Sequence, residues 1–263
     1  MVEVVSARGI VGAPADALLW VDRIGKDFGN FTAVREVSLQ VRQGELKAII
    51  GPNGAGKTTL FNMLSGQLKP SRGRVVYRGS DIGESPTHRL AHLGIGRSFQ
   101  ITNVFRGLTV LENVRIAVQA KLHRHYDFAA RAGSLSQTRD AAERILRTIG
   151  LADYADAPAS TLSHGDQRRL EIGIVLATDP ELVLLDEPTA GMSREEARAT
   201  MELLREIARG RTVLFVEHNM EFVMGISQSI VVMQSGTVIA EGSPTEIRVS
   251  PVVRRAYLGN LYE

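Results

Sequence analysis

A glycine-rich loop at residues 51–58, Gly-Pro-Asn-Gly-Ala-Gly-Lys-Thr, constrains the fold of this chain more than any other feature. The apolar run Leu46–Ile50 precedes the loop and predicts a buried strand, and Thr58–Gly66 predicts a helix after it. The loop matches the spacing G-x-x-x-x-G-K-[ST], in which backbone N–H groups turn inward and surround phosphate oxygens. A chance glycine-rich turn needs neither neighbour, so this order predicts a phosphate-binding α/β core.

The residues of this loop have separate expected roles toward a bound nucleotide. Lys57 can reach the β- and γ-phosphates, and the Thr58 hydroxyl can ligate Mg²⁺. The helix that follows directs the positive end of its dipole toward the same phosphates. ATP and Mg²⁺ are therefore the predicted ligands. The rest of the expected nucleotide-binding surface of the loop is Gly51, Asn53, Gly54, Gly56 and Thr59.

A second apolar run, Leu182–Leu185, is followed directly by the carboxylates Asp186 and Glu187. The end of a strand beside a phosphate loop is where a further Mg²⁺ contact is needed, and Asp186 suits that role through a water molecule. Glu187 points in a different direction and suits the polarisation of an attacking water. The alternative interpretation is an acidic capping turn before Pro188, which leaves the phosphate loop upstream unexplained.

Composition and charge exclude several classes of protein. The net charge is only +2 and no dense basic tract accompanies it, which argues against a nucleic-acid partner. The chain has no cysteine, so disulfides and thiolate metal sites are excluded. No apolar run reaches the ~18 residues that span a bilayer, and residues 1–17 lack the pattern of a secretion signal. We expect a cytoplasmic protein with a flexible tail over residues 1–17, held at a membrane only through other chains.

The order of the expected elements indicates one α/β domain over residues 18–263 with a helical insert. Apolar residues at helical spacing predict helices at Thr109–Ala120 and Thr138–Ile149, separated by the polar stretch Lys121–Gln137. We therefore expect an inserted helical lobe over Ile101–Thr161, and a hairpin turn at Ser235-Gly236. The remaining runs that predict strands are Leu18–Ile24, Val34–Val41, Arg74–Tyr77, Gly96–Phe99, Val213–Val216, Ser229–Gln234 and Thr237–Glu241.

Further motifs occur in the order that is typical of one family of nucleotide-binding proteins. Leu162-Ser163-His164-Gly165-Asp166-Gln167 opens a helix, where a Ser hydroxyl and a Gly backbone make a second anion site. Gln100 and His218 each follow an expected strand, and Phe28 lies upstream of the phosphate loop. Together with the loop and the acidic pair, these residues make the chain resemble the ATP-binding cassette family.

The resemblance implies a fold and a role for each of these residues. The implied fold is an α/β P-loop NTPase core with a parallel sheet, an N-terminal antiparallel β portion and an inserted α-helical subdomain over about residues 101–161. Gln100 is implied to contact Mg²⁺ and the attacking water and to report to a permease, and His218 to contact the γ-phosphate. Phe28 is implied to stack on adenine. Ser163 and Gly165 are implied to touch the phosphate of a nucleotide bound to an opposing cassette.

Three positions depart from the family pattern. His164 replaces the first of two paired glycines, and Asp166 stands where Gln is usual. Ser193, in the segment Ala190-Gly191-Met192-Ser193, replaces the usual Asp or Asn. The last departure bears on how this segment contacts an opposing chain.

Several segments resemble the ATPases of branched-chain and hydrophobic amino-acid importers, and also those of the closely related urea importers. These segments are Gly94–Gln100, the Ser-His-Gly signature, Leu170–Gly173 and Ala256–Gly259. The resemblance implies permease subunits, a solute-binding protein, and either a sister ATPase or a second copy of this chain. It also implies a position at the cytoplasmic face of the membrane, peripheral through the permeases.

Other classes of protein fit the motifs less completely. A non-transport cassette protein acting on ribosomes or DNA normally has two cassettes or a long coiled coil, and Lys121–Gln137 is too short and irregular for heptads. A small-molecule kinase leaves Ser163–Gly165 unexplained, and an exporter fused to its own membrane domain needs apolar spans that the sequence lacks. The leading interpretation is the ATP-hydrolysing subunit of an importer.

Overall fold

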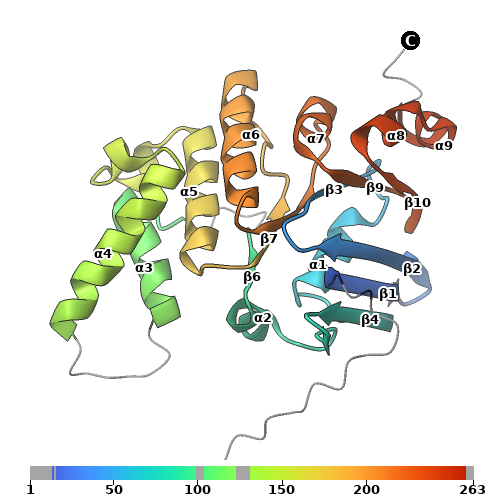
Figure 1. Cartoon of the computed structure of the whole chain (residues 1–263), viewed down its shortest axis with the longest axis horizontal. Coiled ribbons are helices and arrows are strands. Elements are labelled where there is room, and N and C mark those ends of the chain that lie inside the picture. Colours follow the sequence, from blue (N-terminus) through green and yellow to red (C-terminus); the bar gives the residue numbers. More distant parts are fainter. Residues whose placement is uncertain (1–13, 15, 99–103, 123–130, 259–263) are drawn as a thin grey trace, which may run out of the picture. The chain divides into compact units, whose positions relative to one another are not determined.

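The computed structural model describes residues 14, 16–98, 104–122 and 131–258. Contacts divide the chain into two compact units, one of Met1–Leu90 with Ser227–Glu263 and one of Ala91–Ile226. Figure 1 labels the elements of both units, and each unit is described by itself. The expected tail over residues 1–17 falls almost wholly outside the described residues, and the domain boundaries 18–263 and 101–161 remain predictions.

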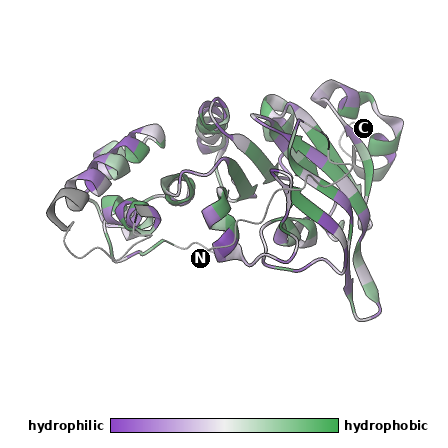
Figure 2. Ribbon diagram, turned by 60° about the horizontal axis from the view of Figure 1, so that its bottom comes forward, coloured by the Kyte–Doolittle hydropathy of each residue, from purple (hydrophilic) through white to green (hydrophobic). Residues whose placement is uncertain are grey.

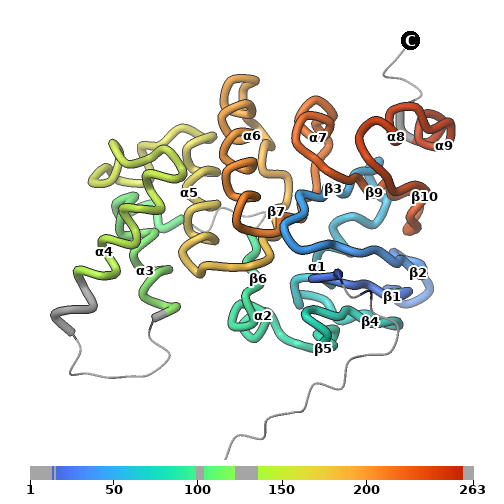
Figure 3. The backbone as a smooth tube through the Cα atoms, in the orientation of Figure 1, coloured from blue at the N-terminus to red at the C-terminus, as the bar shows by residue number. Residues whose placement is uncertain are grey.

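The first unit contains an antiparallel sheet in the order β2-β1-β4-β5. Its strands are β1 (Ala17–Phe28), β2 (Phe31–Arg42), β4 (Arg72–Tyr77) and β5 (Ser80–Asp81). Val21 pairs with Leu39 on one side and with Val75 on the other, and all three side chains are buried. The strands predicted from Leu18–Ile24, Val34–Val41 and Arg74–Tyr77 are confirmed, each somewhat longer than expected. Figure 3 shows the short β5 beside β4.

The first unit also contains the parallel pair β3 (Leu46–Ile50) and β9 (Ser229–Gln234). Every residue of β3 is buried, including Lys47, which interrupts the predicted apolar run and forms an ion pair with Glu241. Strand β9 pairs antiparallel with β10 (Thr237–Gly242), which confirms the hairpin. Ser235 and Gly236 both have positive φ, 49° and 82°, as a two-residue turn of this kind requires.

The helices of the first unit are short. Helix α1 (Lys57–Leu64) follows β3, and α2 (Thr87–Leu93) follows β5. After β10 come α8 (Pro244–Val249), α9 (Pro251–Val253) and the π-helical turn η4 (Arg254–Leu258). Ser243 and Glu246 form a capping box at the start of α8, and Pro244 occupies the first helical position.

The second unit contains three parallel strands, β6 (Ile95–Arg97), β7 (Leu182–Asp186) and β8 (Thr212–Val216), with β7 in the centre. Helices α5 (His164–Ala177), α6 (Arg194–Ala208) and α7 (Met220–Ile226) connect or follow them. The predicted strands at Leu182–Leu185 and Val213–Val216 are confirmed, whereas β6 ends two residues before Phe99. In Figure 2 the strands are mostly green, and the helices carry purple and green segments together, as helices with one buried face do.

The middle of the chain is helical in the described residues. Helix α3 (Val110–Leu122) packs against α4 (Arg131–Thr148) and α5, and the 3₁₀ turns η2 (Ala152–Tyr154) and η3 (Ala159–Thr161) follow α4. Both helices predicted here are confirmed, but α4 begins seven residues before Thr138, within the polar stretch Lys121–Gln137, whose sequence shows no strong periodicity. Its first turns contain Gly133, Ser134 and Ser136, which carry no apolar periodicity, so the packed later turns determine where this helix lies.

Candidate functional site

The phosphate loop of the first unit is held between the buried strand β3 and helix α1. A Cβ atom at Gly51 would collide with the Met233 carbonyl oxygen, and one at Gly56 would lie 2.6 Å from the Ala33 carbonyl oxygen. Gly56 also has φ 94° and is the residue immediately before α1. Only glycine fits both the space and the backbone angle at position 56.

The turn between β9 and β10 is hydrogen-bonded to the phosphate loop. The Gly236 N–H donates to the Ala55 carbonyl oxygen at 3.0 Å, and the Gly236 carbonyl oxygen accepts from the Arg35 N–H at 2.8 Å. One backbone hydrogen bond therefore joins the loop to this turn, and a second joins the turn to β2, so residues far apart in sequence hold the shape of the loop.

The side chains of the loop are arranged for an anion. The Lys57 ammonium donates to the carbonyl oxygens of Gly51 and Pro52 at 2.7 and 3.0 Å, so the side chain folds back over the loop. Asn53, Gly54 and Thr58 are exposed, and Thr59 is half-buried beside them at the start of α1. The loop thus presents a cation, a helix N-terminus and accessible backbone to one ligand.

Phe28 ends strand β1, where it pairs with Phe31 across the turn to β2. Its side chain is 48% exposed, so the ring is not part of the core. The Lys26 ammonium lies 5.4 Å from the ring centroid. The open ring fits a stacking role better than a core role, and Phe31 beside it is exposed as well.

In the second unit, the predicted acidic pair occupies the end of β7. Asp186 is the last residue of the strand and is only 3% exposed. The Arg97 guanidinium from β6 lies 3.4 Å from the Asp186 carboxylate, and the Ser98 hydroxyl accepts from the Asp186 N–H at 3.2 Å. Burial raises the pKa of Asp186, an effect that Arg97 opposes, and burial also lowers the pKa of Arg97.

Glu187, the next residue, has a strained backbone. Its φ is 47°, in the left-handed region that a non-glycine residue rarely occupies. The Glu187 N–H donates to the Val216 carbonyl oxygen at 2.9 Å, and its carbonyl oxygen accepts from the Ala190 N–H at 3.1 Å. These bonds turn the chain sharply at the end of β7, so the Glu187 side chain leaves the strand in a different direction from that of Asp186. Such strain concentrates at functional sites.

A buried carboxylate, Glu217, joins the segment after β7 to the segment after β8. Its side chain is completely buried and accepts from the Thr189 N–H at 2.9 Å and from the Thr189 hydroxyl. It also accepts from the N–H groups of His218 and Asn219, at 2.8 and 3.0 Å. No local pattern in the sequence marks Glu217, since a Glu after an apolar run carries no signal of burial.

His218 lies beside the two glutamates. Its Nδ1 is 3.9 Å from Glu187 Oε1 and 3.8 Å from Glu217 Oε2, while 62% of the side chain is exposed. The structure therefore brings Asp186, Glu187 and His218 together at the ends of neighbouring strands, with the half-buried Glu187 carboxylate and the buried Glu217 carboxylate near the imidazole. This arrangement can accept and hold a proton next to a bound anion.

The signature residues open helix α5 as the sequence predicted. Ser163 precedes the helix, and its hydroxyl accepts from the Asp166 N–H at 3.1 Å. Asp166 forms an ion pair with Arg169 in the same helix, so this departure from the usual Gln creates a local pair one turn apart. The Ser163 hydroxyl and the Gly165 backbone both lie at the positive end of the helix dipole.

The other two departures lie close together in the second unit. A Cβ atom at Gly191 would lie 2.9 Å from His164 Nε2, so the imidazole rests against the Gly191 backbone. Ser193 caps α6, where its hydroxyl accepts from the Glu196 N–H and the Glu196 carboxylate accepts from the Ser193 N–H. The signature segment and segment 191–193 are thus in direct contact within one chain.

Gln100, the remaining candidate residue, lies outside the described residues.

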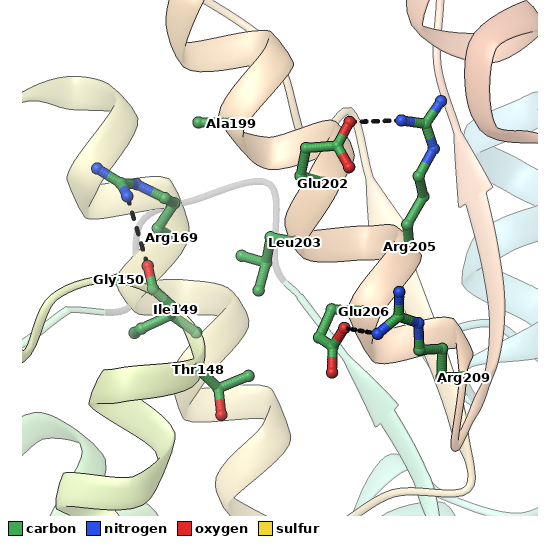
Figure 4. A pocket seen from close by; sticks show the side chains of 10 residues that line it. All are labelled: Thr148, Ile149, Gly150, Arg169, Ala199, Glu202, Leu203, Arg205, Glu206 and Arg209. Atoms are coloured by element: carbon green, nitrogen blue, oxygen red, sulfur yellow. Dashed lines mark hydrogen bonds and ion pairs between the residues drawn. The ribbon is translucent and has the colours of Figure 1, made fainter.

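The pocket drawn in Figure 4 encloses about 410 Å³ in the second unit. It is lined by Arg169 and by ion-paired residues in and just after α6, such as Glu206 and Arg209. None of the described candidate residues lines this pocket, so it carries no part of the predicted site.

Comparisons with known proteins show the family of this chain. A sequence model of the ABC transporter family matches residues 34–190, and a model described as branched-chain amino acid ATP-binding cassette transporter matches residues 237–261. The high-affinity branched-chain amino acid transport ATP-binding protein LivG of Salmonella typhimurium is 42% identical over 249 residues, which cover 92% of this chain and 98% of the relative. The chain belongs to the ABC transporter family.

Solved structures support the same assignment. The ADP conformation of an ATP-binding cassette of an ABC transporter matches with a TM-score of 0.81 and 32% identity, over 93% of this chain and 99% of that chain. A dimeric bacterial ABC transporter cassette matches with a TM-score of 0.74 and 27% identity, over 86% and 98% of the two chains. This cassette is therefore the nucleotide-binding, ATP-hydrolysing subunit of a transporter. In the part of the chain that the structure describes, no helix has both the length and the apolarity of a membrane span.

Proposed function

We propose that this cassette hydrolyses Mg-ATP to drive import of branched-chain amino acids. The observation that carries the catalytic part is the arrangement of Asp186, Glu187 and His218 in a chain with a complete phosphate loop. The cargo is supported by the relative's name and by the match of residues 237–261 to the branched-chain amino acid cassette model.

In this proposal the phosphate loop binds the nucleotide and Phe28 binds its base. Gly51, Gly54 and Gly56 allow backbone N–H groups to surround the phosphates, with Asn53 and Thr59 completing that surface. The Lys57 ammonium exchanges its loop carbonyl partners for phosphate oxygens, which carry full negative charge and are stronger acceptors. The open face of Phe28 stacks on adenine.

The residues present fit Mg²⁺. The Thr58 hydroxyl and the Asp186 carboxylate are hard oxygen donors, the type that Mg²⁺ prefers, and Asp186 is expected to act through water. Among the described residues, no cluster of three or more His, Asp or Glu side chains is poised to hold a metal by itself. Such an ion then takes most of its ligands from phosphate and water, as is usual for Mg²⁺ at nucleotide sites. When bound, it neutralises phosphate charge.

Glu187 is proposed to accept the proton of the attacking water. The water oxygen then bonds to the γ-phosphorus, and the bond from that phosphorus to the bridging oxygen of ADP breaks. His218, 3.9 Å from the Glu187 carboxylate, is proposed to contact the γ-phosphate and to orient this carboxylate. Gln100 is proposed to contact the metal and the water and to link the site to the permease.

The active assembly is proposed to contain two cassettes on two permease subunits, peripheral to the membrane. Ser163 and Gly165 complete the nucleotide site of the opposing cassette, which is either a sister ATPase or a second copy of this chain. A dimeric cassette among the structural matches supports this pairing. A solute-binding protein outside the membrane delivers the cargo.

Uptake measurements test the cargo and the catalytic proposal together. Cells that lack this gene should lose uptake of labelled leucine, and the wild-type gene but not its Lys57→Ala form should restore it. Labelled urea is the matched comparison, because the urea importers are the close alternative. Loss of urea uptake with leucine uptake intact contradicts the cargo assignment, and restoration by Lys57→Ala contradicts the role of the loop.

A further inference from the structure

A carboxylate of this chain lies on the signature residues that are proposed to bind phosphate. The Ser163 hydroxyl donates to Glu196 Oε1 at 3.3 Å. A Cβ atom at Gly165 would lie 2.6 Å from Glu196 Cδ, so the carboxylate sits directly on the Gly165 backbone. Both phosphate-binding positions of the signature segment are therefore covered by one anionic group from α6.

The donors at this place are few, and each can serve one strong acceptor. The Ser163 hydroxyl has a single hydrogen, and its oxygen already accepts from the Asp166 N–H at 3.1 Å. Gly165 offers a single N–H. A phosphate oxygen that takes these two hydrogens must therefore replace the Glu196 carboxylate, because both anions need the same donors and repel each other.

The other oxygen of Glu196 is bound to a different segment. Oε2 accepts from the Ser193 N–H at 2.9 Å as part of the capping box of α6. Glu196 therefore joins the signature segment to segment 191–193, where His164 already touches Gly191. Hydrogen bonds from the Ser193 backbone and hydroxyl, then from Ser163 and the Gly165 backbone, lower the pKa of Glu196, so the side chain is anionic at neutral pH.

We propose that Glu196 is a further positioning residue of the ATP site, the internal anion that occupies the signature donors of a free cassette. It holds the Ser163 hydroxyl and the Gly165 N–H in the orientation that a phosphate needs. When two cassettes close, the γ-phosphate of the opposing nucleotide displaces it, and Glu196 keeps only its contact with Ser193. The inference rests on the proposed role of Ser163 and Gly165, and it adds that ATP competes with this carboxylate.

The test uses Glu196→Gln, which removes the charge and keeps the fold. Gln serves as well as Glu in a capping box, so the start of α6 is preserved. Glu195→Gln is the matched control, because Glu195 is an exposed neighbour in the same helical turn and loses the same charge. Both are placed in a Glu187→Gln background, in which hydrolysis should be blocked and pairing should persist, with the sister ATPase present if that is the partner.

The measured quantity is the ATP concentration that gives half-maximal pairing, followed by light scattering. Glu196→Gln should lower it about twofold to fivefold, the size of an exposed charge interaction, and Glu195→Gln should leave it unchanged. Equal values for the two variants overturn the inference while the proposed pairing stands. A higher half-maximal ATP concentration in Glu196→Gln alone also overturns the inference, because the carboxylate would then assist closure. Absence of pairing in the Glu187→Gln background contradicts the proposed function instead.

A second measurement examines the contact without pairing. The backbone amide signal of Gly165 in a proton–nitrogen correlation spectrum of the nucleotide-free chain should shift in Glu196→Gln and stay in place in Glu195→Gln. An unshifted Gly165 signal in Glu196→Gln shows that the carboxylate does not occupy the site and overturns the inference, whether or not the cassettes pair.

Discussion

Replacing Glu217 with Gln should loosen both segments that carry the catalytic side chains. The two oxygens of Glu217 divide four donors evenly between them. Oε1 accepts from the backbone and the hydroxyl of Thr189, and Oε2 accepts from the N–H groups of His218 and Asn219. A Gln side chain has one oxygen and one NH₂ group. If the NH₂ faces Thr189, the hydroxyl can rotate to accept from it and only the Thr189 N–H faces another donor. The opposite orientation leaves the N–H groups of both His218 and Asn219 facing a donor.

The magnitude follows from this count. Glu217 is fully buried, so solvent does not replace the lost bonds. A hydrogen bond to a charged acceptor contributes about 1.5–3 kcal/mol, and loss of one in the better Gln orientation predicts a free energy of unfolding lower by about 1.5–3 kcal/mol. Thr189 and His218 lie on the two segments that carry the catalytic side chains, so loosening these segments should lower kcat by up to about 100-fold. ATP affinity should change much less.

Urea denaturation measures the free energy of unfolding, and phosphate release measures kcat. The matched control is Glu221→Gln, at the start of α7, whose side chain is 71% exposed. This variant should stay within about 0.5 kcal/mol of wild type and keep its kcat. If Glu217→Gln matches this control in both quantities, Glu217 does not position the catalytic loops, and the reasoning from its hydrogen bonds fails.

Other substitutions separate the remaining roles. Lys57→Ala and Thr58→Ala should each remove most Mg-ATP affinity or turnover, and wild-type values for both in binding and phosphate-release assays would refute the loop assignment. Glu187→Gln should lower hydrolysis by about 10²–10⁴-fold, the contribution of a positioned acid–base group, and with Mg-ATP should accumulate a closed pair in size-exclusion chromatography; an unchanged rate excludes Glu187 as the catalytic carboxylate. Gln100→Ala should leave ATP binding nearly intact and weaken transport-coupled hydrolysis in the reconstituted transporter, whereas unchanged coupling speaks against the link.

Local signals in the sequence were sufficient for the elements that begin or end beside the candidate residues. The four apolar residues of β3, the glycines of the loop and the capping Ser163 each have one favoured local structure, and the structure has it. The same is true of the hairpin at Ser235-Gly236, whose turn needs positive φ at both residues. Helix α4 shows the limit, because its first turns lack apolar periodicity and begin where the sequence indicated none.

The sequence by itself determined the family and most of the candidate residues, because backbone geometry, capping and burial periodicity act over a few neighbouring residues. Tertiary structure alone decided the partners of the charged groups. Arg97 with Asp186, Glu217 with Thr189, and Glu196 with Ser163 join residues 28 to 89 positions apart. Such pairs leave no periodic signal, since a carboxylate has the same local preferences whether its partner is water or a distant donor. Only the packing of β6, β7, β8, α5 and α6 brings these groups within hydrogen-bonding distance.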